Sequence, residues 1–518
     1  MCAVHDVPRL SERCRTCVAH RHLTDVFPPL AQRSWIRRAH VARRFPRSRP
    51  RRRAAVTAPA ADHPGTTTPL AERIARWVTA LRYEDIPPEV RDFTKLLVLD
   101  QIGCELAGAV LPNIQPVLRL AERQPGAAQA TLAHSGRAST VSQAAWVNGT
   151  LGHSGECDDA HPLAWHVTSV VVPAALALAE REGASGRDLI TAVVAGVQTM
   201  ALLGSAGTPP MLATGWHGAK VLGVHGAAAA AGVILGLTPE QQTNAFGIAG
   251  GDSGGTVEYD EHGGEVKRMY PGSAARAGVE AAQLAQLGFT GPPTIFDGRK
   301  GLLNLFAGGG NIAALEAQWD RWLILETIIR FFPGVATNHT PLDVIGKLRK
   351  QYGVKPADVA RIRVGLVDFA VGHGASITRP TDAITAQFSL AFSIGLQFVT
   401  GANAPADYFD PARWTDPDVL GIGDLVEAYA MPIPEGDPVF STRVDIELHD
   451  GTVLSAYQAG FPGHSSRPAT REDIERKFRT AVAGVVPAER AAALLTAVAA
   501  LEEHDTVRAV TRHYGIEG

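Results

Sequence analysis

Residues 148–169 read Asn148-Gly-Thr-Leu-Gly-His-Ser-Gly-Glu-Cys-Asp-Asp-Ala-His-Pro-Leu-Ala-Trp-His-Val-Thr-Ser169. This stretch holds three histidines, three carboxylates and one thiol, whereas only 19% of the whole chain is charged. Apolar, alanine-rich sequence lies on either side of it. The contrast predicts a polar loop inserted in a helical scaffold, and loops held by a rigid scaffold are where binding and catalytic residues concentrate.

Helical periodicity dominates the chain around this loop. Pro87-Pro88-Glu89 has the proline and the early acid that begin a helix, and Thr238-Pro239-Glu240 adds an N-cap to the same signal. The first helix places its apolar residues on one face: Leu70, Ile74, Trp77 and Val78. Apolar runs rich in small residues occupy 173–180, 188–203 and 221–237. Residues 68–325 are therefore predicted to form one large all-helical domain.

The pattern changes after Trp322. Residues 361–367 alternate as a strand, and residues 444–448 lead through Asp450-Gly451 into another strand, which is a strong hairpin signal. Residues 326–461 are therefore predicted to form a smaller α+β domain. Helical periodicity returns from Thr470, so residues 462–518 should pack back on the helical domain and make the α+β unit an inserted lid. The predicted fold class is mainly α, with a ligand cleft between the two domains.

Residues 1–67 differ in composition from the rest. The first 53 residues hold 14 arginines and three acids, a net charge of +11, which is typical of a disordered arm. Cys14 and Cys17, followed by His20 and His22, have zinc-like spacing but form a single cluster without a supporting fold. A nucleic-acid arm, a targeting peptide and a translation start further downstream, for instance at Val56, are alternative interpretations.

The remaining composition describes an ordinary soluble globular protein. With 518 residues and 45% hydrophobic side chains, the chain can bury more than one core. Runs 167–179 and 223–237 are too short or too rich in alanine and glycine to span a bilayer, so no membrane partner is expected. Because the whole chain has a net charge of −3, the part beyond residue 53 carries −14, which argues against nucleic acid as a partner. Five cysteines without a secretory signal indicate a reducing compartment, and the expected location is cytoplasmic.

Three motifs are set aside. Gly251-Asp-Ser-Gly-Gly255 matches the sequence around the nucleophile of chymotrypsin-like proteases, but those enzymes are all-β, so we interpret it as a glycine-rich turn between helices. Gly308-Gly-Gly310 lacks the flanking strand and helix of a phosphate-binding loop. An iron–sulfur cluster needs three or four cysteines, and the body of the chain has only Cys104 and Cys157.

The segment from His153 to His166 has the composition of an acid/base site. Its histidines alternate with carboxylates that can orient and charge them. A divalent metal is possible on residue types alone, but the spacing matches no familiar metal motif and no metal site is predicted. His217 opens an alanine-rich helix, where the positive end of the dipole disfavours its protonated form. Lys267 and Arg268 suit carboxylates, with a solvated surface pair as an equal alternative.

These segments, in this order, resemble the MmgE/PrpD family, which includes 2-methylcitrate dehydratase and cis-aconitate decarboxylase. The resemblance covers about residues 68–500 and is specific through the shared order of its blocks. The blocks are Asn148-Gly149 with His153 and Asp158-Asp159, His166 ahead of 173–180, Gly215-Trp-His217, 226–232, Lys267 with Gly272 and Ala274-Ala275, Gly288-Phe-Thr-Gly291, and Phe388-Ser389-Leu390.

The resemblance implies a homodimer whose subunits have a large helical domain and a smaller lid domain, with a cofactor-free active site in the cleft between them. It also implies dehydration or decarboxylation of a polycarboxylate, using histidines and lysines to bind carboxylates and to move protons. The residues that match family active-site positions are His166, His217, Lys267, Asp158 and Asp159.

Several positions depart from the family pattern. Glu156 stands where aspartate is usual, and Ala160 stands where the decarboxylase has threonine. Arg330 takes the place of a lysine and keeps a carboxylate-binding cation as a bidentate fork. Val335 replaces a histidine or cysteine, and Phe392 replaces a tyrosine. The loss of groups that shuttle protons argues against decarboxylation of cis-aconitate specifically.

The resulting hypothesis is a cofactor-independent lyase acting on a small di- or tricarboxylate of the methylcitrate or aconitate type. His166, oriented by Asp158 or Asp159, is the expected general acid/base, while Lys267 and Arg330 clamp carboxylates together with His217. Further substrate contacts are expected from three residues: Glu156, His161 and Arg268. Two alternatives stay open, an epimerase or isomerase that abstracts an α-proton and a binding protein whose substituted site has lost turnover.

Overall fold

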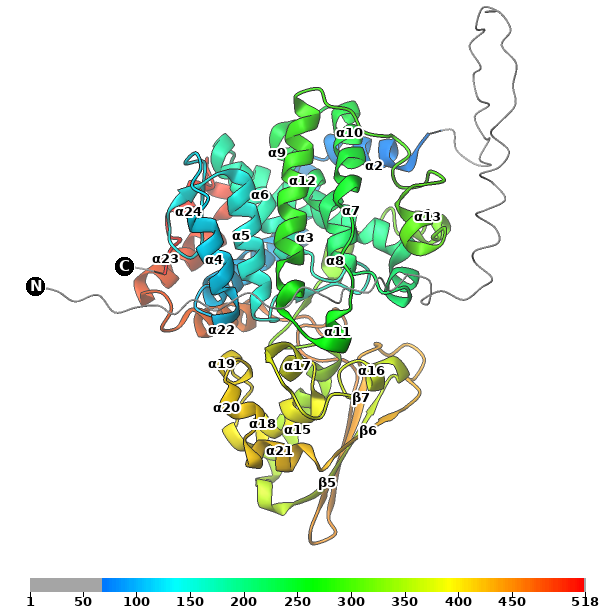
Figure 1. Cartoon of the computed structure of the whole chain (residues 1–518), viewed down its shortest axis with the longest axis vertical. Coiled ribbons are helices and arrows are strands. Elements are labelled where there is room, and N and C mark those ends of the chain that lie inside the picture. Colours follow the sequence, from blue (N-terminus) through cyan, green and yellow to red (C-terminus); the bar gives the residue numbers. More distant parts are fainter. Residues whose placement is uncertain (1–67, 517–518) are drawn as a thin grey trace, which may run out of the picture. The chain divides into compact units, whose positions relative to one another are not determined.

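The computed structural model describes residues 68–516, apart from the side chains of residues 260 and 261. The predictions for residues 1–67, including the Cys14–Cys17 cluster, lie outside the described residues. The described part is mainly α, as predicted (Figure 1). The longer helices of its first part are α2 (Leu70–Ala80), α3 (Pro88–Gly108), α4 (Gln115–Glu122), α5 (Val141–Ser154), α6 (Thr168–Glu182), α7 (Gly186–Ala213), α9 (Gly223–Leu235), α10 (Pro239–Ala249) and α12 (Tyr270–Gln286).

The helix starts follow the signals in the sequence. The Thr238 hydroxyl accepts a hydrogen bond from the Gln241 backbone N–H at 3.2 Å, and Pro239 is the first residue of α10. Pro88 takes the same position in α3. Both predicted helix starts are confirmed. These residues begin helices because the threonine side chain satisfies, and the prolines lack, a backbone N–H group that would have no partner inside the helix.

Small residues allow the central helices to pack closely. A Cβ atom on Gly149 in α5 would lie 2.8 Å from the Cα atom of Gly272 in α12. A Cβ atom on Gly278 in α12 would lie 2.4 Å from the Cβ atom of Ala227 in α9. Side chains at these glycines would push the helices apart, so the sequence fixes a short distance between α5 and α12.

A second hydrophobic cluster surrounds a four-stranded sheet. Its strands are β5 (Val359–Leu366), β6 (Val426–Ala430), β7 (Thr442–Leu448) and β8 (Val453–Gln458), in the order β6-β5-β7-β8. β5 and β6 are parallel, whereas β5–β7 and β7–β8 are antiparallel. The β7–β8 connection contains Asp450-Gly451, with Gly451 at φ 85°, which confirms the predicted hairpin. Helices α15 (His339–Tyr352) and α18 (Leu390–Thr400) contribute the apolar side chains that cover this sheet.

The prediction that residues 68–325 are all-helical is wrong. Strands β1 (Ala130–Thr131) and β2 (Ala138–Ser139) pair antiparallel within this range. Strand β3 (Asp159–Ala160) pairs with β4 (Ile328–Ile329), which lies beyond it in the sequence. Two-residue strands are too short to produce the alternating pattern by which a strand is recognised.

The C-terminal helices α22 (Arg471–Val482) and α23 (Ala488–Ala499) share the hydrophobic cluster of the first helices (Figure 1). Ile474 and Phe478 are fully buried there. Lys477 forms a buried ion pair with Asp100 of α3 at 2.6 Å and donates to the carbonyl of Cys157 at 2.7 Å. The chain thus returns to its first helices after the sheet, while the domain boundaries at residues 326 and 461 stay a prediction.

Two described helical segments, Gly186–Ala213 and Gly218–Leu235, are long and apolar enough to cross a membrane by length and composition. A third span results if the bent pair Pro88–Gly108 and Pro112–Glu122 is counted as one. The expectation that the apolar runs are too short or too rich in alanine and glycine to span a bilayer is therefore wrong for the run 223–237. Within this fold, 94% and 78% of the apolar windows of the two single segments are buried, which accounts for their composition. The absence of a membrane partner stays a prediction.

A buried chain of hydrogen bonds joins the C-terminal segment to the loop between α5 and α6. The Tyr514 hydroxyl donates to Glu105 at 3.1 Å, and the Gln101 amide donates to the other Glu105 oxygen at 3.1 Å. The Thr168 hydroxyl lies 3.2 Å from the Gln101 carbonyl oxygen and 2.5 Å from Asp159 Oδ1. Every link is buried, so each of these polar groups depends on its neighbours for a partner.

Glu105→Gln should make stability less dependent on pH. Burial raises the pKa of Glu105 to about 8, so the carboxyl stabilises the fold fully below its ordinary pKa and loses that contribution as pH rises towards 8. Between pH 6 and pH 8, the wild type should lose about 2 kcal/mol of unfolding free energy relative to Glu105→Gln. Urea unfolding at both pH values measures this, and Glu122→Gln, at an exposed residue of α4, is the control. Parallel pH profiles for wild type and Glu105→Gln would contradict an un-ionised buried Glu105.

Candidate active site

The polar loop predicted from the sequence lies between α5 and α6, beside the turn that precedes α12. The contact between Gly149 and Gly272 brings α5 against α12, and residues Glu265–Met269 form a short 3-10 helix immediately before α12. Lys267 and Arg268 therefore face the loop, and both side chains are buried. The alternative interpretation of these two residues as a solvated surface pair is wrong.

Asp159 holds the end of the loop in place. Its side-chain oxygens accept hydrogen bonds from the backbone N–H groups of Val167 and Thr168, both at 2.9 Å, at the start of α6. Its backbone carbonyl lies 2.9 Å from Nδ1 of His166. Burial and the Asp158 charge raise the pKa of Asp159 to about 7. Asp159 thus positions His166 through its backbone while its side chain caps α6.

His166 has a defined tautomer. Because a carbonyl oxygen can only accept, Nδ1 carries the proton that is donated to Asp159, and Nε2 keeps its lone pair. Burial lowers the pKa of His166 well below its usual value, and the neighbouring His153, Lys267 and Arg330 add to this effect. The imidazole is therefore neutral near pH 7, which is the state that a general base requires.

Glu156 lies at the centre of the cationic side of the site. Its Oε1 accepts from Lys267 Nζ and from Arg330 Nη1, the latter at 3.0 Å, and its Oε2 accepts from Arg268 Nη1 at 2.6 Å. Glu156 has a φ of 53°, unusual for a residue with a side chain, and its carbonyl accepts from Gly334 N–H at 2.9 Å. Despite the cost of burial, the three cations hold the pKa of Glu156 well below its usual range.

Arg330 joins the segment after β4 to the loop. Its Nε donates to the Asp158 carbonyl at 2.7 Å and its Nη1 to the Gly334 carbonyl at 2.9 Å, while Nη2 donates to the Asp158 carboxylate. With the hydrogen bond to Glu156, all three guanidinium nitrogens of Arg330 donate to protein oxygen atoms. The neighbouring His153 and His166, together with Arg330, hold the pKa of Asp158 far below its usual value although the carboxylate is buried.

Lys267 is the most adaptable of the three cations. Burial lowers the pKa of its ammonium group to about 8, against the opposing effect of Glu156. The Nζ atom also lies 5.3 Å from the ring centre of Phe388 and 5.9 Å from that of Tyr259. A cation on aromatic faces and one carboxylate can exchange that carboxylate for an incoming anion without a large loss of contacts.

His217 forms an aromatic wall next to His166. It is the N-cap residue of α8 (Gly218–Val221), and its ring stacks at 6.0 Å from that of His166. Trp165 and Tyr270 contact its ring at 4.9 Å and 5.0 Å. Its Nδ1 has no hydrogen-bond partner among the described residues, and burial lowers its pKa well below the usual value. His217 therefore offers a neutral ring nitrogen for a ligand.

His161 does not share this environment. Its Nε2 lies 2.9 Å from the carbonyl oxygen of Leu323, and its Nδ1 accepts from the N–H of Leu163 at 3.1 Å. Both ring nitrogens are therefore used by the backbone. Its predicted role in substrate binding stays a prediction.

His153 and Gln387 are two contributors to the site, and neither was predicted from the sequence to have a catalytic or substrate-binding role. His153 Nδ1 lies 2.9 Å from Asp158 Oδ2, and its ring lies 4.2 Å from that of His166. Gln387 accepts from Arg268 and donates to the Gly155 carbonyl at 2.9 Å. His153 lies in the last turn of α5, only five residues before Asp158, and this short separation was a usable signal. Gln387 lies more than 200 residues from the loop, so no signal for it was visible in the sequence.

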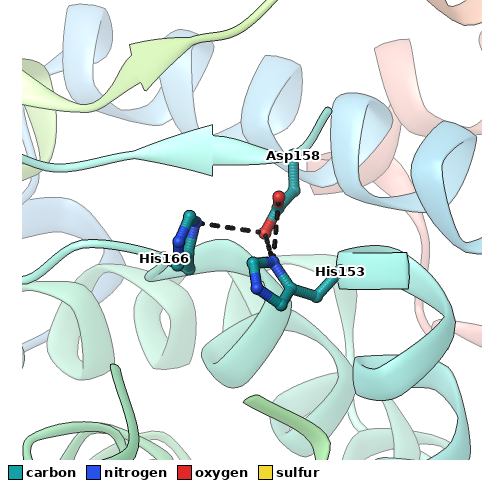
Figure 2. A group of neighbouring side chains, drawn as sticks. All are labelled: His153, Asp158 and His166. Carbon is teal, nitrogen blue, oxygen red and sulfur yellow. Dashed lines mark hydrogen bonds and ion pairs between the residues drawn. The ribbon is translucent and has the colours of Figure 1, made fainter. Parts of the chain in front are cut away.

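His153, Asp158 and His166 each place a possible metal ligand within 4.8 Å of the others (Figure 2). Nδ1 of His153 donates to the Asp158 carboxylate and Nδ1 of His166 to a backbone carbonyl, and Arg330 already supplies a positive charge to the Asp158 carboxylate. The absence of a metal ion, expected from the sequence, stays a prediction.

The substituted positions are apolar. Val335 packs in one hydrophobic cluster with Tyr259, Tyr270 and Phe388, which surround Lys267 and His217. Phe392 is fully buried in a different cluster, with Tyr408 at 6.0 Å between ring centres. Of these two substitutions, the one at Val335 therefore affects the wall of the site more directly.

The serine of the 251–255 motif is not in a catalytic triad. Residues Gly250–Asp252 form a 3-10 turn after α10, which confirms the predicted glycine-rich turn. Ser253 donates to the Val221 carbonyl at 3.1 Å and lies 3.3 Å from His225 Nε2. Nδ1 of His225 has no hydrogen-bond partner in the described part of the chain, and burial lowers its pKa to about 3. Without a carboxylate to orient and charge it, this histidine is a poor base.

Comparison with known proteins agrees with the arrangement of the chain. Residues 72–314 match the MmgE/PrpD N-terminal domain, and residues 332–503 match the MmgE/PrpD C-terminal domain. A protein named cis-aconitate decarboxylase-like protein oryM, from Aspergillus oryzae, is 29% identical over 459 residues, which cover 84% of this chain and 94% of that protein. Cis-aconitate decarboxylase of Aspergillus terreus is 28% identical, with 81% of this chain and 91% of that protein covered. The human protein of the same name is 24% identical, with 85% and 94% covered.

Proposed function

The chain belongs to the MmgE/PrpD family, and on this basis we propose that it is a cofactor-independent lyase that removes water or CO2 from a small di- or tricarboxylate. Relatives named cis-aconitate decarboxylase, which this chain matches over most of their length, support a substrate of the aconitate or methylcitrate type. The exact reaction is the part that needs an experiment.

The single observation that carries the proposal is the buried cluster of Lys267, Arg268 and Arg330 around one carboxylate. Three cations that converge on Glu156 form a carboxylate-binding site in which a protein carboxylate is now bound. A substrate carboxylate that entered would displace or share the Glu156 contacts. Burial makes each such interaction stronger than it would be in water.

The neighbouring imidazoles supply the proton chemistry. His166 Nε2 would take the proton when a C–H bond breaks, and the electron pair left on carbon would form an enolate-like charge. Lys267 and Arg330 would stabilise that charge more strongly than the charge of the bound substrate. His217, beside His166, would orient the substrate through its free Nδ1.

The proposed architecture has a lid over this site. In it, the sheet-containing part of about residues 326–461 closes on the helical part, and Arg330 links the two because it follows β4 and binds the loop. We also propose a cytoplasmic homodimer, as expected from the sequence and from the family resemblance.

An activity screen tests the proposal. Purified protein is incubated with methylcitrate, citrate, cis-aconitate and related acids, and products are read by mass: loss of water, loss of CO2 or neither. Turnover of one acid with loss of water or CO2 is expected. Exchange of deuterium from solvent without a mass loss would instead identify an epimerase or isomerase.

The Glu156 clamp favours one second candidate, a carboxylate-binding protein without turnover. Three cations already paired with a buried carboxylate can hold a ligand without being available to stabilise a developing charge. In that case a tricarboxylate would raise the melting temperature and remain unchanged after long incubation.

A further inference from the structure

His153 and His166 face the same carboxylate from two sides. Nε2 of His153 lies 3.7 Å from Oε2 of Glu156, and Nε2 of His166 lies 3.9 Å from Oε1. Neither distance is a hydrogen bond, and Nε2 of His153 has no hydrogen-bond partner among the described residues. Two lone pairs thus face a carboxylate, so either imidazole would gain an ion pair with Glu156 on taking up a proton.

The two imidazoles cannot hold a proton equally well. Nδ1 of His153 donates to the ionised Asp158 carboxylate, which stabilises a positive ring. Nδ1 of His166 donates to a neutral backbone carbonyl and lies 3.6 Å from Asp158 Oδ2, beyond hydrogen-bond distance, while Nη2 of Arg330 lies 3.4 Å from the same nitrogen. The guanidinium disfavours a second positive charge there. His153 is therefore the stronger base, and His166 is the ring that stays neutral.

Only one of the two rings can be charged at a time. Their centres are 4.2 Å apart, and the protein shields neither from the other. Burial lowers the pKa of both, and that of His166 falls further below its usual value. A single extra proton in this pair would therefore reside on His153.

The charges around the two imidazoles determine whether His153 is protonated before or after a ligand binds. Lys267, Arg268 and Arg330 contribute three positive charges, and the fully buried carboxylates Glu156 and Asp158 contribute two negative ones. Before a ligand carboxylate binds, this surplus opposes a further proton. A ligand carboxylate bound to the cations reverses the balance and makes protonation of His153 favourable.

We propose that His153, oriented by Asp158 and facing Glu156, takes up a proton from solvent when a carboxylate ligand binds to Lys267, Arg268 and Arg330. The N–H bond forms at Nε2, the bond that held this proton to the solvent or buffer acid breaks, and no other bond changes. His166 keeps its lone pair for the substrate, so the site holds an acid and a base at the same time. This inference rests on the proposed function, because it needs a carboxylate at the cation cluster.

Calorimetry of ligand binding tests the inference without turnover. The probe is propane-1,2,3-tricarboxylate, which has neither the hydroxyl group nor the double bond that lyase chemistry uses. Binding heats at pH 7.5 in phosphate and in Tris differ by the number of protons taken up times the difference in buffer ionisation enthalpy. We expect uptake of roughly 0.5 to 1 proton for the wild type, and affinity that falls up to about tenfold per pH unit as pH rises.

His153→Asn separates proton uptake from positioning. The asparagine amide can still donate to Asp158 but has no nitrogen that takes up a proton, so uptake should fall to roughly 0.2 proton or less while binding persists. His513→Asn, at a partly buried histidine in the C-terminal segment, should take up as many protons as the wild type. Equal uptake by wild type and His153→Asn, or binding to the wild type without uptake, would overturn the inference.

A second measurement covers the case in which His153→Asn does not fold. Wild-type protein labelled with 15N at histidine should show one ring Nε2 moving to the chemical shift of a protonated nitrogen when the tricarboxylate is added. No such movement in a ligand-saturated sample would reject the inference. Failure of every tested carboxylate to bind would reject the proposed carboxylate site itself, and the inference with it.

Discussion

Arg330→Met lowers the free energy of unfolding by about 3–5 kcal/mol, the largest stability loss that we expect from a single substitution in the site. The guanidinium donates four hydrogen bonds, two to Asp158, one to Glu156 and one to Gly334, and it is 1% exposed. Removing it leaves the buried Asp158 carboxylate with His153 as its remaining side-chain hydrogen-bond partner among the described residues. Urea unfolding at pH 7 measures the change.

Two further arginine variants serve as controls for Arg330→Met. Arg330→Lys keeps the charge but loses the fork, so it should lie between wild type and methionine. Arg361→Met removes an exposed pair with Glu427 and should cost less than about 1 kcal/mol. A loss at Arg330→Met no larger than at Arg361→Met would mean that the buried network does not hold the loop.

His166→Asn should lower kcat by a factor of about 10² to 10⁴ on the true substrate, as expected when a general base is lost. The asparagine amide can donate to the Asp159 carbonyl as Nδ1 does, and Asp159 still caps α6, so the melting temperature should change by only a few degrees. Steady-state kinetics with each variant, after the screen has identified the substrate, measure the effect. Full activity in both His166→Asn and Lys267→Ala would reject the assignment of this site.

The pH profile of the wild type gives an independent check on His166. A general base must be neutral, and burial places the pKa of this imidazole well below its usual value. The acid limb of kcat/KM should therefore lie below the range expected for an ordinary histidine, with activity retained at pH 6. An acid limb centred above pH 6.5 would show that His166 is protonated too readily to act in this way.

Sequence alone placed much of the site but not its internal contacts. The loop after α5, the helix start at His217 and the Lys267-Arg268 pair were all visible as polar residues in apolar surroundings, and the structure brings them together with Arg330. The sequence did not predict that the Glu156 carboxylate contacts all three cations, Lys267, Arg268 and Arg330. That contact depends on a backbone φ of 53° and on three separate elements, neither of which leaves a local pattern.

The fold shows the same division. The N-cap at Thr238 and the Asp450-Gly451 hairpin were predictable because their signals lie within a few residues of each other. The β3–β4 pairing joins residues about 170 positions apart, and each strand has only two residues. Such short strands give no alternating pattern from which the pairing could be predicted. Nothing in the sequence indicated that both ring nitrogens of His161 would contact backbone groups, because Leu323 lies far from it along the chain.

The buried chain from Tyr514 through Glu105, Gln101 and Thr168 to Asp159 means that the foundation of the site extends to the last described residues. Substitutions in the segment around Tyr514 can therefore change the position of Asp159 through this chain of hydrogen bonds. We therefore expect a substitution near Tyr514 to affect the site in the same way as a substitution of a residue in the loop itself.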